Sequence, residues 1–476
     1  MSRPSILSAA ALLLAGVAAS APAQQPPPAP QPLVAPQPPA APQQPPTEPI
    51  AARIARAVAA VSPQRVEATV RTLVGFGTRH VLSQTTSDRE GTGAARRWLQ
   101  AQFAAIAAEA GGRLQVALQP GRVACGREGL PAEIDITNVL ATLRGERDPD
   151  RIYVIGGHYD SRNGTPADGT RPAPGAVDDA SGTAVALEAC RVLAGEHLLA
   201  TIVFCAFDGE EQGLLGSSYC AKQFAANGAA IDGMIGCDIV GNTLGMDGVR
   251  RTGYVRCFSY APTGNDSLGR SLARALTWAA RTHVPDFTVE LVFRGDRYGR
   301  GGDHRSFFDA GFPAVRLTEP REDFSRQHQD VTERDGRPYG DVPEYCDFAY
   351  TANVARVVAA TLAELAAAPA PPLARRAQGA RAAYDTLLEF ELPAGVEDCE
   401  FVWRKTTAPD WEGAIARADA KVEDAGRGRL RAQLKGLCLD DLVVGVRSVG
   451  KDGARSRVAT PPEPERLQLR PAEGGR

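Results

Sequence analysis

The stretch IYVIGGHYDS at residues 152–161 joins an apolar run to a group of polar residues. The run at 152–155 has the length and the β-branched composition of a short buried strand. Further runs of this kind lie at 134–143, 201–207, 234–240, 287–293 and 314–317. Strands that are apolar on both sides are typical of a sheet covered on both faces. The sequence therefore predicts a sheet that is buried between two layers of helices.

Helical stretches lie before, between and after these runs. Apolar residues recur at helical spacing at 53–73, 93–110, 181–193, 267–280, 307–310 and 345–366. Strands that alternate with helices indicate an α/β fold with a mixed, mostly parallel sheet and helices on both faces. We expect this domain to span residues 50–366.

A second, smaller domain is predicted after a linker rich in alanine and proline at 367–374. Beyond the linker, strand-like runs appear without long helices, at 387–392, 400–405, 429–434 and 441–449. This pattern predicts a small all-β sandwich at 375–461. Residues 462–476 are expected to form a tail.

The N-terminus has the features of an export signal. Residues 1–23 carry one basic residue, Arg3, then an apolar stretch, and end in Ala-Pro-Ala. This order is typical of a secretory signal peptide with its cleavage site. The apolar stretch is shorter than the roughly 20 residues of a membrane-spanning helix, which disfavours a permanent anchor. We expect an exported protein, periplasmic or secreted, with no membrane span and with a Pro/Gln/Ala-rich linker at 24–49.

Composition excludes several classes of protein. The chain of 476 residues has 53 Lys and Arg against 56 Asp and Glu, so its formal net charge is −3. This balance gives no electrostatic reason to expect a nucleic-acid partner. The nine cysteines are scattered and show no CxxC spacing, which makes a small disulfide scaffold or a thiolate zinc ribbon unlikely to explain the fold. Nothing in the sequence indicates the oligomeric state.

Two of the polar segments that follow predicted strands carry a histidine and aspartates. His158 follows the run at 152–155, and Asp160 comes two residues later, where its carboxylate can accept an imidazole N–H. Asp178 and Asp179 lie at the start of the predicted helix at 181–193. Taken singly, a histidine after a strand is more often structural, and aspartates at a helix start are often caps.

Two further segments carry acidic residues at strand ends. Glu210 and Glu211 follow the run at 201–207 between glycines, and Asp238 lies in the run at 234–240. Neighbouring like charges are costly unless a cation or a proton compensates them, although a solvated loop is the simpler alternative. A buried aspartate is rare unless it is paired or binds a metal. In an open α/β sheet, ligands bind at the carboxyl ends of the strands, where all these residues are expected.

Together these segments resemble the zinc-dependent exopeptidase family that includes bacterial leucyl aminopeptidases, glutamate carboxypeptidases and glutaminyl cyclases. The matching motifs occur in the family's order over residues 75–366. They are HYDS at His158, PGAVDDASG around Asp178, FDGEEQGLLGS around Glu210, Cys-Asp ending at Asp238, and GGDHRSFFDAGFPAV from 301 followed by RQHQDVT around His328.

The resemblance implies a site with two zinc ions per subunit. One ion would be bound by His158 and Asp238, the other by Glu211 and His328, and Asp178 would bridge them. Three protein ligands for each ion leave room for water and substrate, as catalytic zinc requires. Such a set of histidines and carboxylates also accepts cobalt or manganese.

The resemblance also implies catalytic roles. Glu210 would be the general base that takes a proton from the water bridging the two metal ions and later gives it to the leaving amine. Asp160 and Asp179 would orient His158 and Asp178. Tyr298 lies near the position where the family often has a tyrosine that stabilises the oxyanion, about one residue out of register.

These roles predict an aminopeptidase that hydrolyses the N-terminal residue of peptides with a free amino end. Aminopeptidase is preferred because the segment at 111–131 is too short for the inserted domain that several other members carry. The alternatives are a carboxypeptidase or glutaminyl cyclase of the same fold, or a non-catalytic envelope binding protein. The C-terminal region resembles a fibronectin type III domain on CEFVWRKTTAPDWE from Cys399 and LCLDDLVVGVRSVGKDGARS from Leu437.

Overall fold

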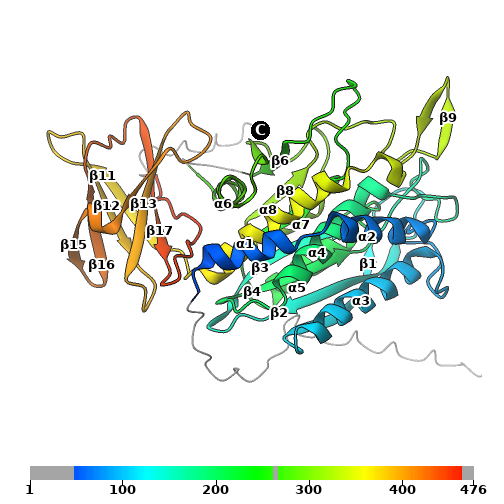
Figure 1. Ribbon diagram of the computed structural model, residues 1–476, viewed down its shortest axis with the longest axis horizontal. Coiled ribbons are helices and arrows are strands. Elements are labelled where there is room, and N and C mark those ends of the chain that lie inside the picture. Colours follow the sequence, from blue (N-terminus) through cyan, green and yellow to red (C-terminus); the bar gives the residue numbers. More distant parts are fainter. Residues whose placement is uncertain (1–47, 261–265, 464–476) are drawn as a thin grey trace, which may run out of the picture.

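The computed structural model describes residues 48–260 and 266–463 as two regions that lie side by side (Figure 1). The predicted signal peptide at 1–23, nearly all of the predicted linker at 24–49 and most of the predicted tail lie outside the described residues. The larger region contains the α-helices and a long twisted sheet, and the smaller region contains strands and one 3-10 turn, η3 (Arg417–Asp419).

The larger region is built on an eight-stranded sheet, which confirms the predicted α/β class. Four neighbouring pairs of strands are parallel and three are antiparallel, so the sheet is mixed and mostly parallel. Its spatial order is β1 (Leu114–Ala124), β2 (Glu133–Leu143), β4 (Ala200–Phe207), β3 (Asp148–His158), β5 (Ala230–Cys237), β8 (Ala314–Thr318), β6 (Tyr254–Ser259) and β7 (Thr288–Val292).

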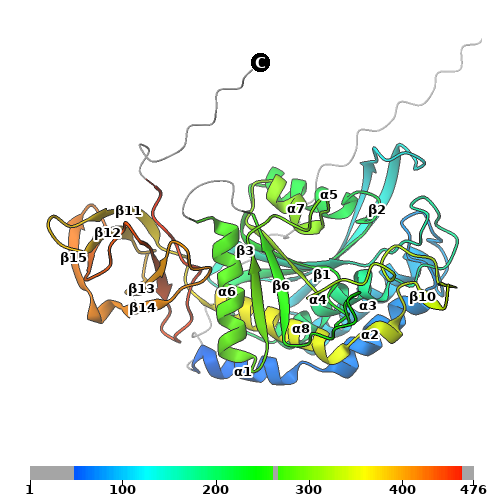
Figure 2. The ribbon, with the colours of Figure 1, turned by 90° about the horizontal axis from the view of Figure 1, so that it is seen from above.

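Helices cover both faces of this sheet (Figure 2). One face packs against α1 (Ile50–Ala60), α2 (Pro63–Gly75), α3 (Gly91–Glu109), α4 (Ser181–Leu193), α6 (Leu268–His283) and α8 (Phe348–Ala367). The other face packs against α5 (Leu215–Ala226) and α7 (Asp303–Asp309). None of the helices in the described ranges is long and apolar enough to cross a membrane.

The central strands are apolar throughout because both faces are buried. In β3, Tyr153 and Ile155 belong to the larger core cluster, whereas Ile152 and Val154 belong to the cluster under α5 and α7. Successive side chains of a strand point to opposite faces, so this division means that β3 contributes to both cores.

One predicted helix of the larger region needs correction, and three of its elements were missed. The helical stretch at 53–73 is two helices, because the Ser62 hydroxyl accepts the Arg65 N–H and Pro63 occupies the first turn of α2. Strands β1 and β6 and helix α5 were not predicted. β1 is an edge strand whose side chains are mostly exposed or half-buried, so it lacks a continuous apolar run.

The smaller region is a β sandwich of two antiparallel sheets. One sheet has the order β11 (Leu373–Gly379), β12 (Thr386–Glu391), β16 (Arg429–Leu434), β15 (Lys421–Gly426), and the other has β14 (Gly413–Ala416), β13 (Asp398–Lys405), β17 (Leu442–Val449). The rings of Phe390 and Phe401 meet edge to face between the sheets, with centroids 5.5 Å apart. The small β domain is confirmed, and its resemblance to fibronectin type III stays a prediction.

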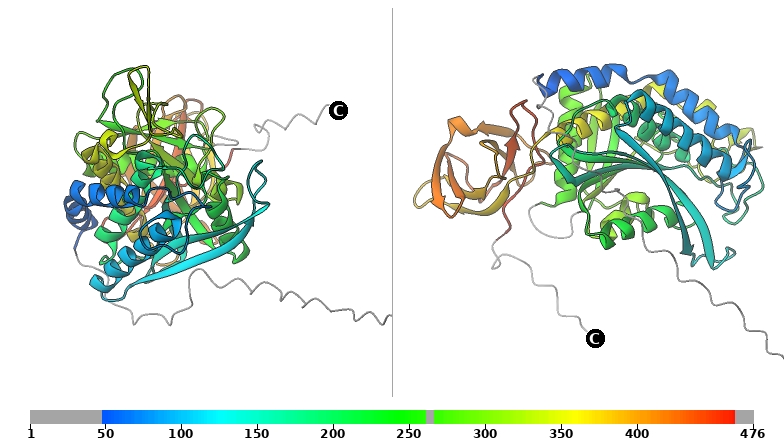
Figure 3. Two further views of the ribbon diagram at one scale, coloured as in Figure 1. Left: turned by 90° about the vertical axis from the view of Figure 1, so that its right-hand side faces the viewer. Right: turned by 90° about the horizontal axis from the view of Figure 1, so that it is seen from below.

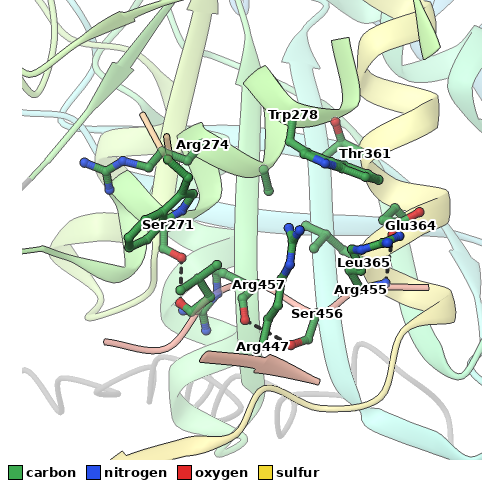
Figure 4. Close-up of a pocket in the computed structure, with 13 residues that line it drawn as sticks. Ser271, Arg274, Trp278, Thr361, Glu364, Leu365, Arg447, Arg455, Ser456 and Arg457 are labelled. Atoms are coloured by element: carbon green, nitrogen blue, oxygen red, sulfur yellow. Dashed lines mark hydrogen bonds between the residues drawn. The ribbon is translucent and has the colours of Figure 1, made fainter. Parts of the chain in front are cut away.

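The sandwich packs against the larger region through its last strand and the segment that follows it (Figure 3). Ala454 belongs to the main core cluster of the larger region. Ser271 on α6 donates its hydroxyl to the carbonyl oxygen of Val458 at 2.7 Å, and Glu364 on α8 accepts the Arg455 N–H at 2.7 Å. Figure 4 shows these side chains around a small cavity between the two regions.

The remaining short elements lie in connections. A small hairpin is formed by β9 (Thr332–Arg334) and β10 (Arg337–Tyr339). A short turn, η1 (Ala176–Ala180), leads into α4, and the backbone of Asp178 and Asp179 in it is not helical. This turn carries the two aspartates that the sequence singled out.

Candidate metal centre

The predicted ligands gather at the carboxyl ends of four neighbouring parallel strands. His158 is the last residue of β3, Glu211 lies in the loop after β4, and Asp238 directly follows β5. His328 lies in the loop after β8. Strands β4, β3, β5 and β8 are adjacent in the sheet, so these loops meet at one edge, as expected for ligand sites in open α/β sheets.

Asp178 lies between the two histidines. Its Oδ1 is 3.2 Å from His158 Nε2, and its Oδ2 is 3.0 Å from His328 Nε2. Glu211 Oε2 is 2.9 Å from the same nitrogen of His328. Asp238 Oδ1 is 3.9 Å from His158 Nε2. The five side chains therefore form two sets of donors that share the Asp178 carboxylate.

Asp179 lies close to the set around His158, but its oxygens have other partners. His158, Asp179 and Asp238 offer atoms that all lie within 4.8 Å of one another, as do Asp178, Glu211 and His328. The Asp179 carboxylate accepts backbone N–H groups from His158 at 3.2 Å, Gly182 at 2.8 Å and Ile239 at 3.2 Å. These bonds hold three loops together, which leaves Asp178 as the carboxylate that faces both histidines.

The donor atoms fit divalent cations of the zinc type. His158 Nε2 and Glu211 Oε1 are buried and have no hydrogen-bond partner among the described residues. Buried polar atoms are rarely left unpaired, so these two atoms point to a missing partner. Imidazole nitrogens together with carboxylate oxygens are a donor set that zinc accepts, and each set offers three side chains with the shared Asp178.

The electrostatics of the site also call for positive charge. Burial alone would lower the pKa of His158, but Asp160, Asp178 and Glu210 raise it well above its ordinary value. Burial likewise opposes protonation of His328, yet Glu211 and Asp178 raise its pKa to about 10. The carboxylates thus favour cationic histidines, and a divalent cation that binds here would displace those protons.

Asp160 connects His158 to the loop that carries the glutamates. Its Oδ1 is 3.4 Å from His158 Nδ1, and the same imidazole nitrogen lies 3.2 Å from the Asp160 backbone oxygen. Its carboxylate also accepts the backbone N–H of Glu210 at 3.0 Å and of Glu211 at 3.1 Å. One buried carboxylate therefore fixes the ring of a histidine and the position of both glutamates.

Glu210 differs from its neighbour because its side chain is not tied down. Its Oε2 lies 4.0 Å from His158 Nε2, and no hydrogen bond engages its carboxylate within the described part of the chain. Burial, together with the carboxylates of Asp238 and Glu211, raises the pKa of Glu210 well above its ordinary value despite the opposing effect of His158. A carboxylate in this state is suited to accept a proton.

Tyr298 is not brought into the site. Its side chain is 88% exposed, and its ring lies 5.5 Å from the guanidinium carbon of Arg294. The two residues next to Tyr298 in the chain, Arg297 and Gly299, line the cavity beside the ligands instead. Its predicted role as an oxyanion donor stays a prediction, and reaching the ligands would require its loop to move.

Two residues at the site were not predicted as site residues. Asp303, the first residue of α7, is buried with neither carboxylate oxygen hydrogen-bonded, and burial raises its pKa to about 7. Arg316 on β8 is fully buried and places Nη2 2.9 Å from Asp238 Oδ1. Asp303 lies within the quoted GGDHRSFFDAGFPAV motif, whereas Arg316 has no distinguishing signal in the sequence.

Comparisons with known proteins give the family of this chain. A family model described as "Peptidase family M28" matches residues 138–360. A protein of Phaeosphaeria nodorum named "Probable zinc metalloprotease" is 40% identical over 84% of this chain and 86% of its own length. The chain belongs to peptidase family M28. A second relative with the same name, from Pyrenophora tritici-repentis, is 39% identical over 84% of this chain and 95% of its own length.

Solved structures agree with the M28 assignment at the level of the fold. The Legionella pneumophila LapA aminopeptidase superposes with a TM-score of 0.51 and 21% identity, over 68% of this chain and 78% of its own. At this identity the likeness shows the fold alone. The family and the names of its relatives together support a zinc-dependent peptidase that acts on peptides.

Proposed function

We propose that this M28 chain is an exported aminopeptidase that uses two zinc ions to remove the N-terminal residue of peptides. The observation that carries the proposal is the placement of Asp178, whose two oxygens face different histidines at 3.2 and 3.0 Å. A carboxylate that is shared between two donor sets is what a bridging ligand requires. A site for a single ion would need only one of the two sets.

The chain supplies three side chains to each ion in this proposal. His158 and Asp238 would hold one ion, Glu211 and His328 would hold the other, and Asp178 would give one oxygen to each. Two bound zinc ions would polarise the scissile carbonyl and lower the pKa of a nucleophilic water. Asp160 and Asp179 keep the ligand loops in place through the backbone hydrogen bonds that their carboxylates accept.

Glu210 would move the proton. Its carboxylate lies beside the ligands without a hydrogen bond of its own, so it can accept a proton from the attacking water. It would then give that proton to the leaving nitrogen as the peptide bond breaks. The same residue therefore serves both halves of the hydrolysis.

Three observations support the preference for the amino end and the export of the protein. The LapA structure, whose fold this chain shares, is that of an aminopeptidase. Only β1 and a turn lie between α3 and β2, so the larger region has no inserted domain at that point. Residues 1–23 have the order of a secretory signal peptide.

A carboxypeptidase is the second candidate, because a C-terminal carboxylate would find cations near the site. Arg127 and Arg162 line the cavity beside the ligands. Neither guanidinium has a hydrogen-bond partner among the residues that the structure describes. This observation concerns the substrate rather than the ions.

The proposal is tested with one set of peptides presented with free and with acetylated amino ends. The mature protein is assayed by mass spectrometry before chelation, after chelation and after the return of zinc. We expect loss of single residues from the free amino end only, abolished by chelation and restored by two zinc equivalents. Trimming of acetylated peptides from the carboxyl end would reassign the protein as a carboxypeptidase, and loss of ammonia from N-terminal glutamine without cleavage would indicate a cyclase.

A further inference from the structure

The cavity beside the candidate metal ligands is unusually rich in arginine. It has a volume of about 320 Å³, within the range of small-molecule sites. Asp178, Glu210, Glu211, Asp238 and His328 form part of its wall. The same wall carries five guanidinium groups, those of Arg127, Arg162, Arg297, Arg300 and Arg305.

Three of these arginines already have carboxylate partners. Arg297 and Arg300 both donate to Glu322 Oε2, at 3.1 and 2.8 Å. Arg305 lies 3.5 Å from Asp309 on its own helix. These pairs occupy part of the donor capacity of the wall formed by the segment from β7 into α7.

Arg162 has only a long contact with a carboxylate although it is largely buried. Its side chain is 14% exposed, and its Nε is buried without a hydrogen bond among the described residues. Its nearest carboxylate is Glu211, whose Oε2 lies 3.9 Å from Nε and also contacts His328 at 2.9 Å. A buried N–H group without a hydrogen-bond partner is costly, so a missing partner is expected at Nε.

Arg127 stands on the same side of the cavity, in the turn between β1 and β2. A β-carbon built on Gly213 would lie 3.4 Å from Arg127 Nε, which places the guanidinium beside the loop that carries Glu210 and Glu211. The turn is held to this loop by Cys125, whose Sγ lies 3.6 Å from the Gln212 carbonyl oxygen. Within the described ranges Arg127 forms no ion pair and no side-chain hydrogen bond.

We infer that Arg127 and Arg162 bind a carboxylate of the substrate next to the metal ligands. Two guanidinium groups that line one cavity, neither with a hydrogen bond among the described residues, present the donors that carboxylates bind in bidentate fashion. If zinc takes up the negative charge of Glu211, the cavity wall on this side is left cationic. A substrate carboxylate would then supply the partner that Arg162 lacks in the folded chain.

The carboxylate has two chemical sources, and the inference rests on the proposed peptidase function. It can be the acidic side chain of the substrate's N-terminal residue, or the free C-terminal carboxylate of a short peptide. A Glu-Ala-Ala amide compared with a Gln-Ala-Ala amide isolates the side chain. Ala-Ala-Ala compared with its amide isolates the terminal carboxylate.

The test uses the zinc-loaded full-length protein and the variants Arg127→Gln and Arg162→Gln. Arg122→Gln is the matched control, because Arg122 is exposed, lies five residues away on β1 and pairs with Glu133. We expect kcat/KM to favour the charged member of one peptide pair by at least about tenfold in the wild type and in the control. Either cavity variant should reduce that ratio by roughly tenfold, mainly through KM.

Binding provides an independent readout. Calorimetric titration with glutamate against glutamine tests the side-chain source, and titration with alanine against alaninamide tests the terminal carboxylate. The charged member of one pair should bind more tightly by about tenfold or more, and this difference should shrink in both cavity variants. Cleavage of all four peptides with charged-to-neutral ratios near one would overturn the carboxylate subsite and leave the peptidase proposal standing. If no peptide is cleaved, the peptidase proposal fails, and equal binding within both pairs of ligands would overturn the subsite as well.

Discussion

Glu210 and Glu211 are neighbours in the chain, but their surroundings give them different roles. Glu211 Oε2 contacts His328, whereas the Glu210 carboxylate has no hydrogen bond within the described residues and lies 4.0 Å from His158. A side chain that binds a metal must hold its donor atom still. A general base needs a carboxylate that other groups do not engage, which agrees with the role proposed for Glu210.

Replacing Glu210 with glutamine tests this division. The amide keeps the shape of the side chain but cannot accept and return a proton, so we expect turnover to fall roughly 10²-fold or more. Zinc content should stay close to that of the wild type because the ligands are untouched. Turnover on a neutral tripeptide and zinc per subunit are measured together, and near-wild-type turnover would exclude Glu210 as the general base.

Asp160 acts on the site through other residues, which gives a different prediction. Asp160→Asn replaces an oxygen that accepts a backbone N–H of the Glu210–Glu211 pair with an amide that repels it. We expect zinc affinity to fall roughly 10- to 100-fold, as is typical when a partner of a metal ligand is removed. Competition with a zinc chelator measures the affinity. Asp150→Asn at an exposed position is the control, and equal affinities of the two variants would contradict the positioning role.

The sequence singled out some of the individual residues of the site but not others. His158, Asp178 and Glu211 stand out because their motifs combine residue type and spacing, and the structure brings their donor atoms together. Arg127 and Arg162 could not be singled out, because an arginine carries no local pattern and its lack of a partner appears only once the chain has folded. The roles of all these residues stay predictions.

At the scale of the elements, the buried strands were easier to predict than the edges. β3 and β4 are buried over nearly their whole length, which produces continuous apolar runs. β1 pairs only with β2 and is largely exposed, so its sequence resembles a loop. Helix α5 begins after Leu214, which adopts a positive φ, and its first turn contains glycine and serines rather than an apolar stripe.

The start of α4 depends on a close approach that only glycine permits. A β-carbon on Gly182 would lie 2.0 Å from the Cys237 carbonyl oxygen and 2.5 Å from Asp179 Oδ2. The first contact is with the backbone of a buried strand, which cannot move aside easily. Helix α4 must therefore approach the end of β5 closely for Asp179 to hold the ligand loops.

We expect Gly182→Ala to lower the free energy of unfolding by about 3 kcal/mol or more, as over-packing of a rigid site does. Zinc affinity should fall with it, since Asp179 lies in the same contact. Gly195→Ala is the matched control, because it lies just beyond the other end of α4 with no atom within 4 Å of the added carbon. Denaturant unfolding measures the free energy of unfolding of both variants. Equal values would contradict the prediction, because they would show that β5 and α4 can separate without loss of stability.

At the scale of the whole molecule, the β sandwich is packed onto the catalytic region rather than tethered to it. Arg457 Nη2 lies 2.8 Å from the Asp232 carboxylate, near the start of β5. Ala454 contributes to the main core cluster of the larger region. The sequence predicted two domains and a linker but not this interface. The contacts named for this interface join residues more than 90 positions apart in the sequence. A local sequence pattern cannot predict contacts between such distant residues.

Glu364 on α8 lies in this interface and is nearly fully buried (Figure 4). Burial raises its pKa from 4.5 to about 7, although Arg455 and Arg447 oppose the shift. The folded protein therefore binds a proton at Glu364 that the unfolded chain has released between about pH 4.5 and 7. Stability contributed by this group is complete below pH 4.5, decreases as the pH rises and is lost above pH 7.

Glu364→Gln should remove this pH dependence while retaining an oxygen for the Arg455 N–H. We expect the wild type to lose roughly 1–3 kcal/mol of unfolding free energy relative to the variant between pH 4.5 and pH 8. Urea unfolding of both proteins across this range measures the difference. Glu333→Gln, at an exposed position on β9, is the control and should give a constant difference from the wild type. A constant difference for Glu364→Gln as well would mean that water reaches this carboxyl group and that the two regions are not closely packed in solution.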